Sequence, residues 1–105
     1  MRGRPLYYDR KGRPLGCRQW ARLFENNPDR YRFVGKTVVG SLLVSTVWLG
    51  IDHSFSETGP PLIFETMIFP ECEVFGRWPT EEAALAGHDQ AVEEMRHRLA
   101  IGDQL

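Results

Sequence analysis

The sequence predicts an α+β fold: an antiparallel β-meander of about four strands, with an N-terminal and a C-terminal helix packed on the sheet. The middle of the chain consists of short apolar segments of β type separated by turn residues. Both ends show the apolar spacing of three and four residues that is typical of amphipathic helices. With 105 residues, 42% of them hydrophobic, the chain can build one core but not two. We therefore expect a single domain over residues 1–105, with residues 1–5 as a flexible basic start.

The first third is expected to hold a short strand and a helix. Residues 6–8 have strand composition, and the segment 9–12 suits a type I turn because it begins with Asp and ends with Gly. Residues 16–26 repeat apolar side chains at helical spacing. Pro28 cannot continue a helix and disfavours helical geometry in the residue before it, so we expect the helix to end there. The expected apolar face consists of Cys17, Trp20, Ala21 and Phe24.

Four strands are expected next, at residues 31–39, 42–51, 62–69 and 72–78. The first alternates apolar and polar side chains, as half-buried strands do. Gly40 and Ser41 suit a tight hairpin turn to the second strand. The second and third strands are apolar on both sides, which favours central positions covered on both faces. The fourth contains Gly76, which is typical of an edge strand or a bulge.

The last helix is expected from about Glu81 to Leu99, with Thr80 as its N-cap. Two helices can cover only one face of the sheet, while both central strands are apolar on both sides. The uncovered face therefore needs a partner, and a second copy of the chain is one candidate. The expected inner face of the helix consists of Ala84, His88, Ala91, Val92, Met95 and Leu99.

Charge is distributed unevenly although the formal net charge is only -1. Residues 1–36 carry ten Lys and Arg against three acids, a net +7, and residues 37–105 carry three against eleven, a net -8. A basic N-terminal third can serve as an arm for nucleic acid. Alternatively, the two halves fold together and neutralise each other. We favour the second interpretation because no run of five to eight Lys or Arg is present.

The composition also indicates in which cellular compartment the protein is expected. The two cysteines, Cys17 and Cys72, are far apart and form no CxxC motif, which favours a reducing cytoplasm over a disulfide scaffold. No apolar run reaches the roughly 18 residues that span a membrane. The first residues lead into Tyr and Asp and not into an apolar core, so we expect no secretion signal.

No catalytic motif is present, and the sequence assigns no catalytic residue and no cofactor. The best candidate constellation for metal binding or acid–base chemistry is Asp52, His53, Glu65 and His88. Each of the four also has a structural interpretation. Asp52 caps a turn, His53 lies in a loop, Glu65 accepts hydrogen bonds on a sheet face, and His88 is a core histidine with satisfied hydrogen bonds. We favour the structural interpretation because the four residues form no spaced motif.

Aromatic residues lie among the cations of the basic third. Exposed rings beside cations are the feature that stacks single-stranded nucleic acid. Trp20 and Phe33, however, have the periodicity of core residues, and the other rings are also explained by a core. Nucleic-acid binding therefore remains a possible but less favoured function. The rings concerned are Tyr7, Tyr8, Trp20, Tyr31 and Phe33.

Two stretches, VSTVWLGIDHSF at 44–55 and GPPLIFETMIF at 59–69, resemble a family of small uncharacterised proteins of bacteriophages and prophages. The resemblance extends to Tyr7–Arg10 and to Thr80–Ala83, and so spans most of the chain. It implies a phage accessory protein in the cytoplasm of an infected bacterium. Small phage proteins of this kind bind one host protein or complex, including defence systems such as CRISPR effectors. The family implies no activity and no catalytic residue.

We therefore expect a non-enzymatic protein that binds a host protein or complex and inhibits host defence. The alternatives are a small metal-dependent enzyme that uses the Asp/His/Glu quartet, and single-stranded nucleic-acid binding through the basic third. The candidate partner-binding residues are Arg2, Arg4, Tyr8, Arg10, Lys11, Arg18, Arg22, His53 and Phe55.

Overall fold

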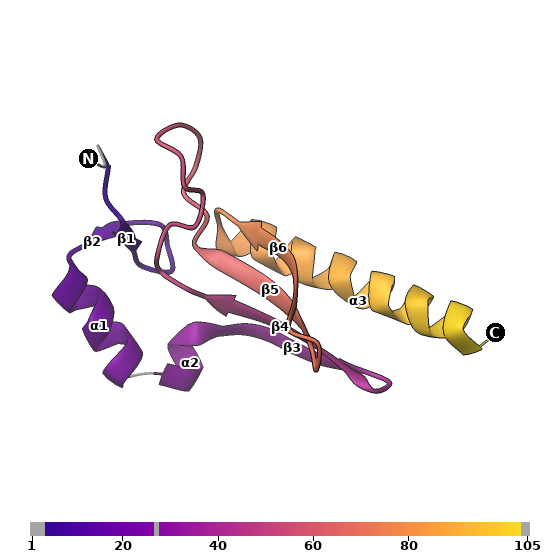
Figure 1. Cartoon of the computed structure of the whole chain (residues 1–105). Coiled ribbons are helices and arrows are strands. Elements are labelled where there is room, and N and C mark those ends of the chain that lie inside the picture. The colour runs from indigo at the N-terminus through magenta and orange to yellow at the C-terminus, as the bar shows by residue number, and fades with distance from the viewer. Residues whose placement is uncertain (1–3, 27, 104–105) are drawn as a thin grey trace.

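The computed structural model describes residues 4–26 and 28–103. It confirms the α+β meander: a four-stranded antiparallel sheet in the order β3-β4-β5-β6, with helix α3 packed against all four strands (Figure 1). A two-stranded sheet, β1-β2, and helices α1 and α2 lie at one end of the main sheet (Figure 1). The elements are β1 (Tyr7–Tyr8), β2 (Pro14–Leu15), α1 (Cys17–Asn26), α2 (Pro28–Arg32), β3 (Phe33–Val39), β4 (Leu42–Trp48), β5 (Phe64–Phe69), β6 (Glu73–Trp78) and α3 (Glu81–Asp103).

The strand register decides which side chains share a face. Strands β4 and β5 pair Thr46 with Thr66 and Val47 with Glu65. Since neighbouring side chains on a strand point to opposite faces, these two pairs lie on opposite sides of the sheet. Thr46 and Thr66 lie on the side covered by α3, where Thr46 contacts His88. We call the other side, with Val47 and Glu65, the open face.

The core lies between α3 and the sheet, in two apolar clusters. A layer of polar side chains, Thr37, Thr46, Thr66 and His88, lies between them. One cluster is centred on Val39, Val44, Ile68, Ala91, Val92 and Met95. The other is centred on Tyr8, Trp48, Ile63, Phe64 and Ala84. The predicted inner face of the last helix is thereby confirmed, with Leu99 only partly buried.

The N-terminal helix packs on the end of the sheet. The ring of Phe24 stacks on Trp48 with centroids 5.1 Å apart, and Tyr31 meets Trp48 edge-on at 4.8 Å. The indole N–H of Trp20 donates to the carbonyl of Leu49 at 3.1 Å. Helix α1 therefore closes the core where β4 ends, while α3 runs along the sheet (Figure 1).

The structure differs from the prediction in several element boundaries and in two short elements. Strand β3 begins at Phe33 and not at residue 31, because Pro28 opens a new short helix, α2. Proline fits the first turn of a helix because the N–H that it lacks has no partner there. Strand β2 was not predicted; its two residues pair with β1 across the predicted turn at residues 9–12. The two central strands are shorter than predicted, and α3 extends four residues further.

Candidate interaction surfaces

The four candidate metal ligands are not brought together. Glu65 lies on the open face, where its carboxylate accepts a hydrogen bond from Arg77 at 2.9 Å. His88, a residue of α3, lies on the other side of the sheet. Asp52 and His53 lie in the loop after β4. Within the described ranges 4–26 and 28–103, no three His, Cys, Asp or Glu side chains form a group that could hold a metal ion.

His88 is a core histidine. Its Nδ1 lies 2.7 Å from the hydroxyl oxygen of Thr46, and its Nε2 lies 2.9 Å from that of Thr37. A neutral imidazole accepts one hydrogen bond and donates one, and the two hydroxyls satisfy both. Burial lowers the pKa of His88, and the opposing effect of the nearby Asp89 carboxylate does not offset it. His88 therefore has no open coordination position for a ligand.

Asp52 braces the loop between β4 and β5. One oxygen of its buried carboxylate accepts hydrogen bonds from the backbone N–H groups of Ser54 and Leu62, at 2.8 and 3.0 Å. The other pairs with the guanidinium of Arg4 at 2.8 Å. Arg4 also donates to the carbonyl of Gly59 and to the Ser54 hydroxyl. The predicted turn-capping role of Asp52 is confirmed, and the described part of the N-terminal start is anchored at Arg4.

Phe55 projects from this braced loop, which extends beyond the end of the sheet in Figure 1. Its side chain is 84% exposed, and its φ of 54° lies in the left-handed region that bulky L residues rarely adopt. The ring of the half-buried His53 meets Phe55 edge-on at 6.2 Å. The ring nitrogen Nδ1 of His53 lies 2.9 Å from the carbonyl oxygen of Ile51. Phe55 and His53 thus form an aromatic pair on this loop.

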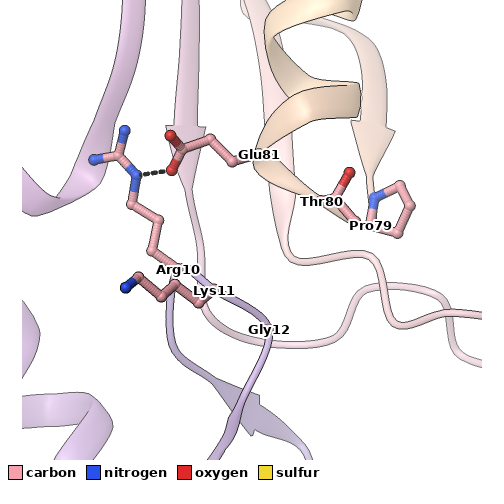
Figure 2. A pocket seen from close by; sticks show the side chains of 6 residues that line it. All are labelled: Arg10, Lys11, Gly12, Pro79, Thr80 and Glu81. Atoms are coloured by element: carbon pink, nitrogen blue, oxygen red, sulfur yellow. Dashed lines mark hydrogen bonds and ion pairs between the residues drawn. The ribbon is translucent and has the colours of Figure 1, made fainter.

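The candidate partner-binding cations differ in whether they make contacts within the chain or are exposed. Arg10 donates to the Glu81 carboxylate and to the backbone carbonyl of Tyr31. Figure 2 shows this Arg10–Glu81 contact beside a hollow of about 380 Å³ at the start of α3. Lys11, which also lines the hollow, is exposed, as are Arg18 and Arg22 on α1. Arg2 lies outside the described residues.

Tyr8 was wrongly predicted as a partner contact. It is only 6% exposed, and its hydroxyl donates to the carbonyl of Pro5. The cause is that Tyr8 lies in the small β1-β2 sheet, and its carbonyl accepts the indole N–H of Trp48 at 3.2 Å. Tyr8 therefore belongs to the core that packs around Trp48.

The basic third is partly neutralised by the rest of the fold. Arg4 pairs with Asp52 and Arg10 with Glu81, and both pairs join the basic segment to the acidic one. Asp9, at the start of the first turn, pairs with Arg13 at 2.7 Å. Burial opposes ionisation of Asp9, but hydrogen bonds and charge from Arg13, together with the backbone N–H of residue 11, lower its pKa. The structure thus supports the interpretation that the two halves fold together.

The aromatic rings of the basic third are not arranged for base stacking. Tyr7 packs against Trp20 with centroids 5.0 Å apart, and Tyr31 packs against Trp48. Phe33 has Lys36 Nζ at 3.8 Å from its ring centroid. These rings are engaged by protein neighbours, whereas stacking requires exposed faces.

The open face of the sheet carries a shallow apolar groove of about 310 Å³. No helix of the described residues covers it. Arg32 and Lys36 lie at the rim of the groove, at the end of α2 and on β3. The other lining residues are Phe33, Leu43, Ser45, Val47 and Phe69. The predicted apolar second face of the central strands is therefore present, and no helix in the described part of the chain covers it.

Comparison of the chain with protein-family models, with curated proteins and with solved structures finds no match. The resemblance to small phage proteins therefore stays a prediction. No helix among the described residues is long and apolar enough to cross a membrane.

Proposed function

We propose that this chain is a non-enzymatic phage accessory protein that binds a host protein or complex through the loop at residues 52–61, with Phe55 as the central contact. The phage origin and the cytoplasm of the infected bacterium rest on the sequence resemblance, and inhibition of host defence rests on analogy with other small phage proteins that bind host factors. The observation that carries the binding role is the exposure of Phe55 on a braced loop.

Phe55 is costly for the isolated chain in two ways. An aromatic side chain left in water forgoes its burial energy, and a non-Gly residue in the left-handed region costs about 1 kcal/mol or more. Among the described residues the ring of Phe55 contacts one other ring, that of His53, and Phe55 remains 84% exposed, so burial within the described fold does not offset these costs. A partner that buries the ring would compensate for both. Interface residues that dominate affinity are often aromatic and fill a pocket on the partner.

The loop is also prepared for binding before a partner arrives. The hydrogen bonds of Asp52 and the bridge from Arg4 to Gly59 tie the two ends of the loop to each other and to the N-terminal segment. A loop that is already ordered loses less conformational entropy on association. The geometry therefore favours recognition of a protein surface over chemistry at this end of the molecule.

The test begins with capture of host proteins on the tagged chain, in parallel with and without nuclease and with and without chelator, and identification by mass spectrometry. The captured protein is then purified and its affinity measured by isothermal titration calorimetry. Phe55→Asn is expected to weaken binding by about 30-fold or more, because an anchor of this kind contributes about 2 kcal/mol. Leu85→Gln, which alters another exposed apolar residue, on α3, is expected to leave affinity unchanged.

Phe55→Asn is not expected to unfold the protein. Asn tolerates the left-handed region better than Phe, and no buried contact is lost. Its free energy of unfolding should equal or exceed that of the wild type by up to about 1 kcal/mol, measured by urea denaturation. Equal affinity of the folded variant for the purified partner would refute the role of Phe55. Capture that disappears with nuclease or with chelator would instead favour the nucleic-acid or the metal alternative.

A further inference from the structure

The groove on the open face has the composition of a binding site. Its floor is apolar, and the hydroxyl of Ser45 lies among the aliphatic side chains of Leu43 and Val47. Ligand sites commonly combine an apolar lining with a few polar groups that set orientation. Val38 and Val74, which the register places on the same face, are 75% and 45% exposed. The apolar surface therefore continues beyond the groove itself.

The rim of the groove is positive. The guanidinium of Arg32 lies 5.4 Å from the centroid of the Phe33 ring, and Lys36 Nζ lies 3.8 Å from it. Neither cation forms an ion pair with any residue that the structure describes. Glu65 is the only acid that the pairing of these described strands places on the open face, and it is bonded to Arg77. An incoming negative charge would therefore meet two unneutralised cations held in place on an aromatic ring.

A second copy of this chain is a poor occupant. Four strands about 4.8 Å apart and six to seven residues long make a flat face of roughly 400 Å². Two such faces would bury roughly 800 Å², below the about 1,200 Å² of specific, stable interfaces. A second open face would also bring the same two cations, and its only acid is already paired with Arg77.

Nucleic acid fits the groove less well than protein does. Bases need an exposed aromatic face for stacking. The ring of Phe33 has Lys36 directly over it and Arg32 nearby, and the rest of the groove between them and Phe69 is aliphatic or hydroxylic. A polypeptide segment with carboxylates and large apolar side chains matches both the charge and the floor.

We propose that the open face is a second binding surface, and that its groove binds an acidic segment of a partner protein with apolar side chains. The apolar side chains of the partner segment would pack on Leu43, Val47 and Phe69. Its carboxylates would pair with Arg32 and Lys36. This surface is distinct from the Phe55 loop, and it does not require that the loop act as proposed.

The probe is a synthetic ten-residue peptide in which Glu and Asp alternate with Phe and Leu. Titrated into the isotopically labelled full chain, it should shift the amide NMR signals of residues 33–36, 43–47 and 67–69. The double variant Arg32→Glu/Lys36→Glu should weaken binding by about 5- to 30-fold, as expected for the loss of two partly exposed ion pairs. A peptide with Lys in place of the acids should not bind.

A matched control separates a local contact from general charge attraction. Arg18→Glu/Arg22→Glu makes the same change in net charge on α1, where both arginines are exposed. It should leave peptide affinity within about twofold, because neither arginine lines the groove and salt screens exposed charges that make no direct contact. Phe55→Asn should also leave it unchanged, so that failure of the loop proposal and failure of this one are distinguishable.

Four outcomes of the peptide and oligonucleotide titrations would overturn the proposal. They are no shift on addition of the acidic peptide, shifts confined to another surface, equal weakening by the two charge-reversal pairs, and tighter binding of a ten-nucleotide oligo(dT) to the same residues. Concentration-dependent shifts of the groove signals without peptide would identify a second copy as the occupant and would equally refute it.

Discussion

At the scale of single residues, His88 is a polar group that the fold buries and satisfies. Trp78 Nε1 donates to the hydroxyl of Thr66 at 3.0 Å, and that oxygen lies 2.6 Å from the hydroxyl of Thr46, which in turn contacts His88. This continuous network crosses the core between the two apolar clusters. A buried network with every member satisfied specifies one packing arrangement, whereas loss of one member leaves the others unpaired.

The lowered pKa of His88 predicts acid sensitivity. The unfolded chain takes up a proton near pH 6.5, while the folded chain resists it because the charged ring would be buried. The free energy of unfolding is therefore highest above about pH 6.5, and it falls as the pH drops from there toward the lower pKa of the folded state. Urea denaturation at pH 7.5, 6.5 and 5.5 should show this decline.

The variant His88→Leu should be less stable at pH 7.5 by about 1–3 kcal/mol, since the buried hydroxyl of Thr46 and the partly buried hydroxyl of Thr37 each lose a hydrogen bond to the imidazole. Its stability should also change less between pH 7.5 and 5.5 than that of the wild type. His97→Gln, which alters an exposed residue of the same helix, should retain the wild-type decline. An unaltered decline in His88→Leu would show that another group causes the acid sensitivity.

At the scale of elements, α3 contains two glycines in different surroundings. A Cβ placed on Gly87 would lie 2.3 Å from the Trp78 ring, while one on Gly102 would meet nothing within 4 Å. Trp78 cannot easily withdraw, because its indole N–H is bonded to Thr66. Gly87 is therefore the position where the helix can approach β6 closely.

Substitution of these two glycines should change stability in opposite directions. Helix propensity alone favours Ala over Gly by about 1 kcal/mol. Gly102→Ala should be stabilising by up to that amount, less near the end of the helix. Gly87→Ala should be destabilising by about 1–3 kcal/mol, because overpacking against Trp78 outweighs propensity. Thermal melting of both variants checks this, and equal stabilisation would show that α3 does not pack on β6 as described.

Element types were predictable because they depend on local periodicity. The two long helices, the four-stranded meander and the hairpin at Gly40 all follow from spacing and turn residues, and Gly40 has the positive φ of 59° that a tight turn requires. Strand β2 was missed because two residues carry no periodicity. The start of β3 was misplaced because the ring of Tyr31 would be expected to face the core from either a strand or a helix. In the structure Tyr31 belongs to α2 and packs against Trp48.

At the scale of the whole molecule, ion pairs join the basic N-terminal third of the chain to the acidic remainder. The Arg4–Asp52 and Arg10–Glu81 pairs join segments 48 and 71 residues apart in sequence. Other exposed cations of the basic third include Arg18 and Arg22 on α1, Lys11 in the first turn and Lys36 at the rim of the groove. The molecule therefore presents an aromatic loop at one end and a positive, apolar sheet face along its side.

The small area of the open face predicts that the isolated protein is a monomer. Sedimentation equilibrium at about 10–100 μM should give a mass near 12.1 kDa. The reason is that a face-to-face dimer would bury less surface than stable interfaces do. A mass twice as large that falls in Val47→Lys would show instead that the open face pairs two copies, as the apolar pattern of the central strands first suggested.

The sequence by itself determined the fold class, the inner face of the last helix and the core position of His88, because each depends on spacing within one element. It also singled out Asp52, His53 and Phe55, but it could not show that Asp52 is a brace or that Phe55 projects. Those properties depend on Arg4 and on backbone geometry in the loop. The separation of Glu65 from His88 and the positive groove were decided by register and packing between distant segments, which local periodicity does not encode.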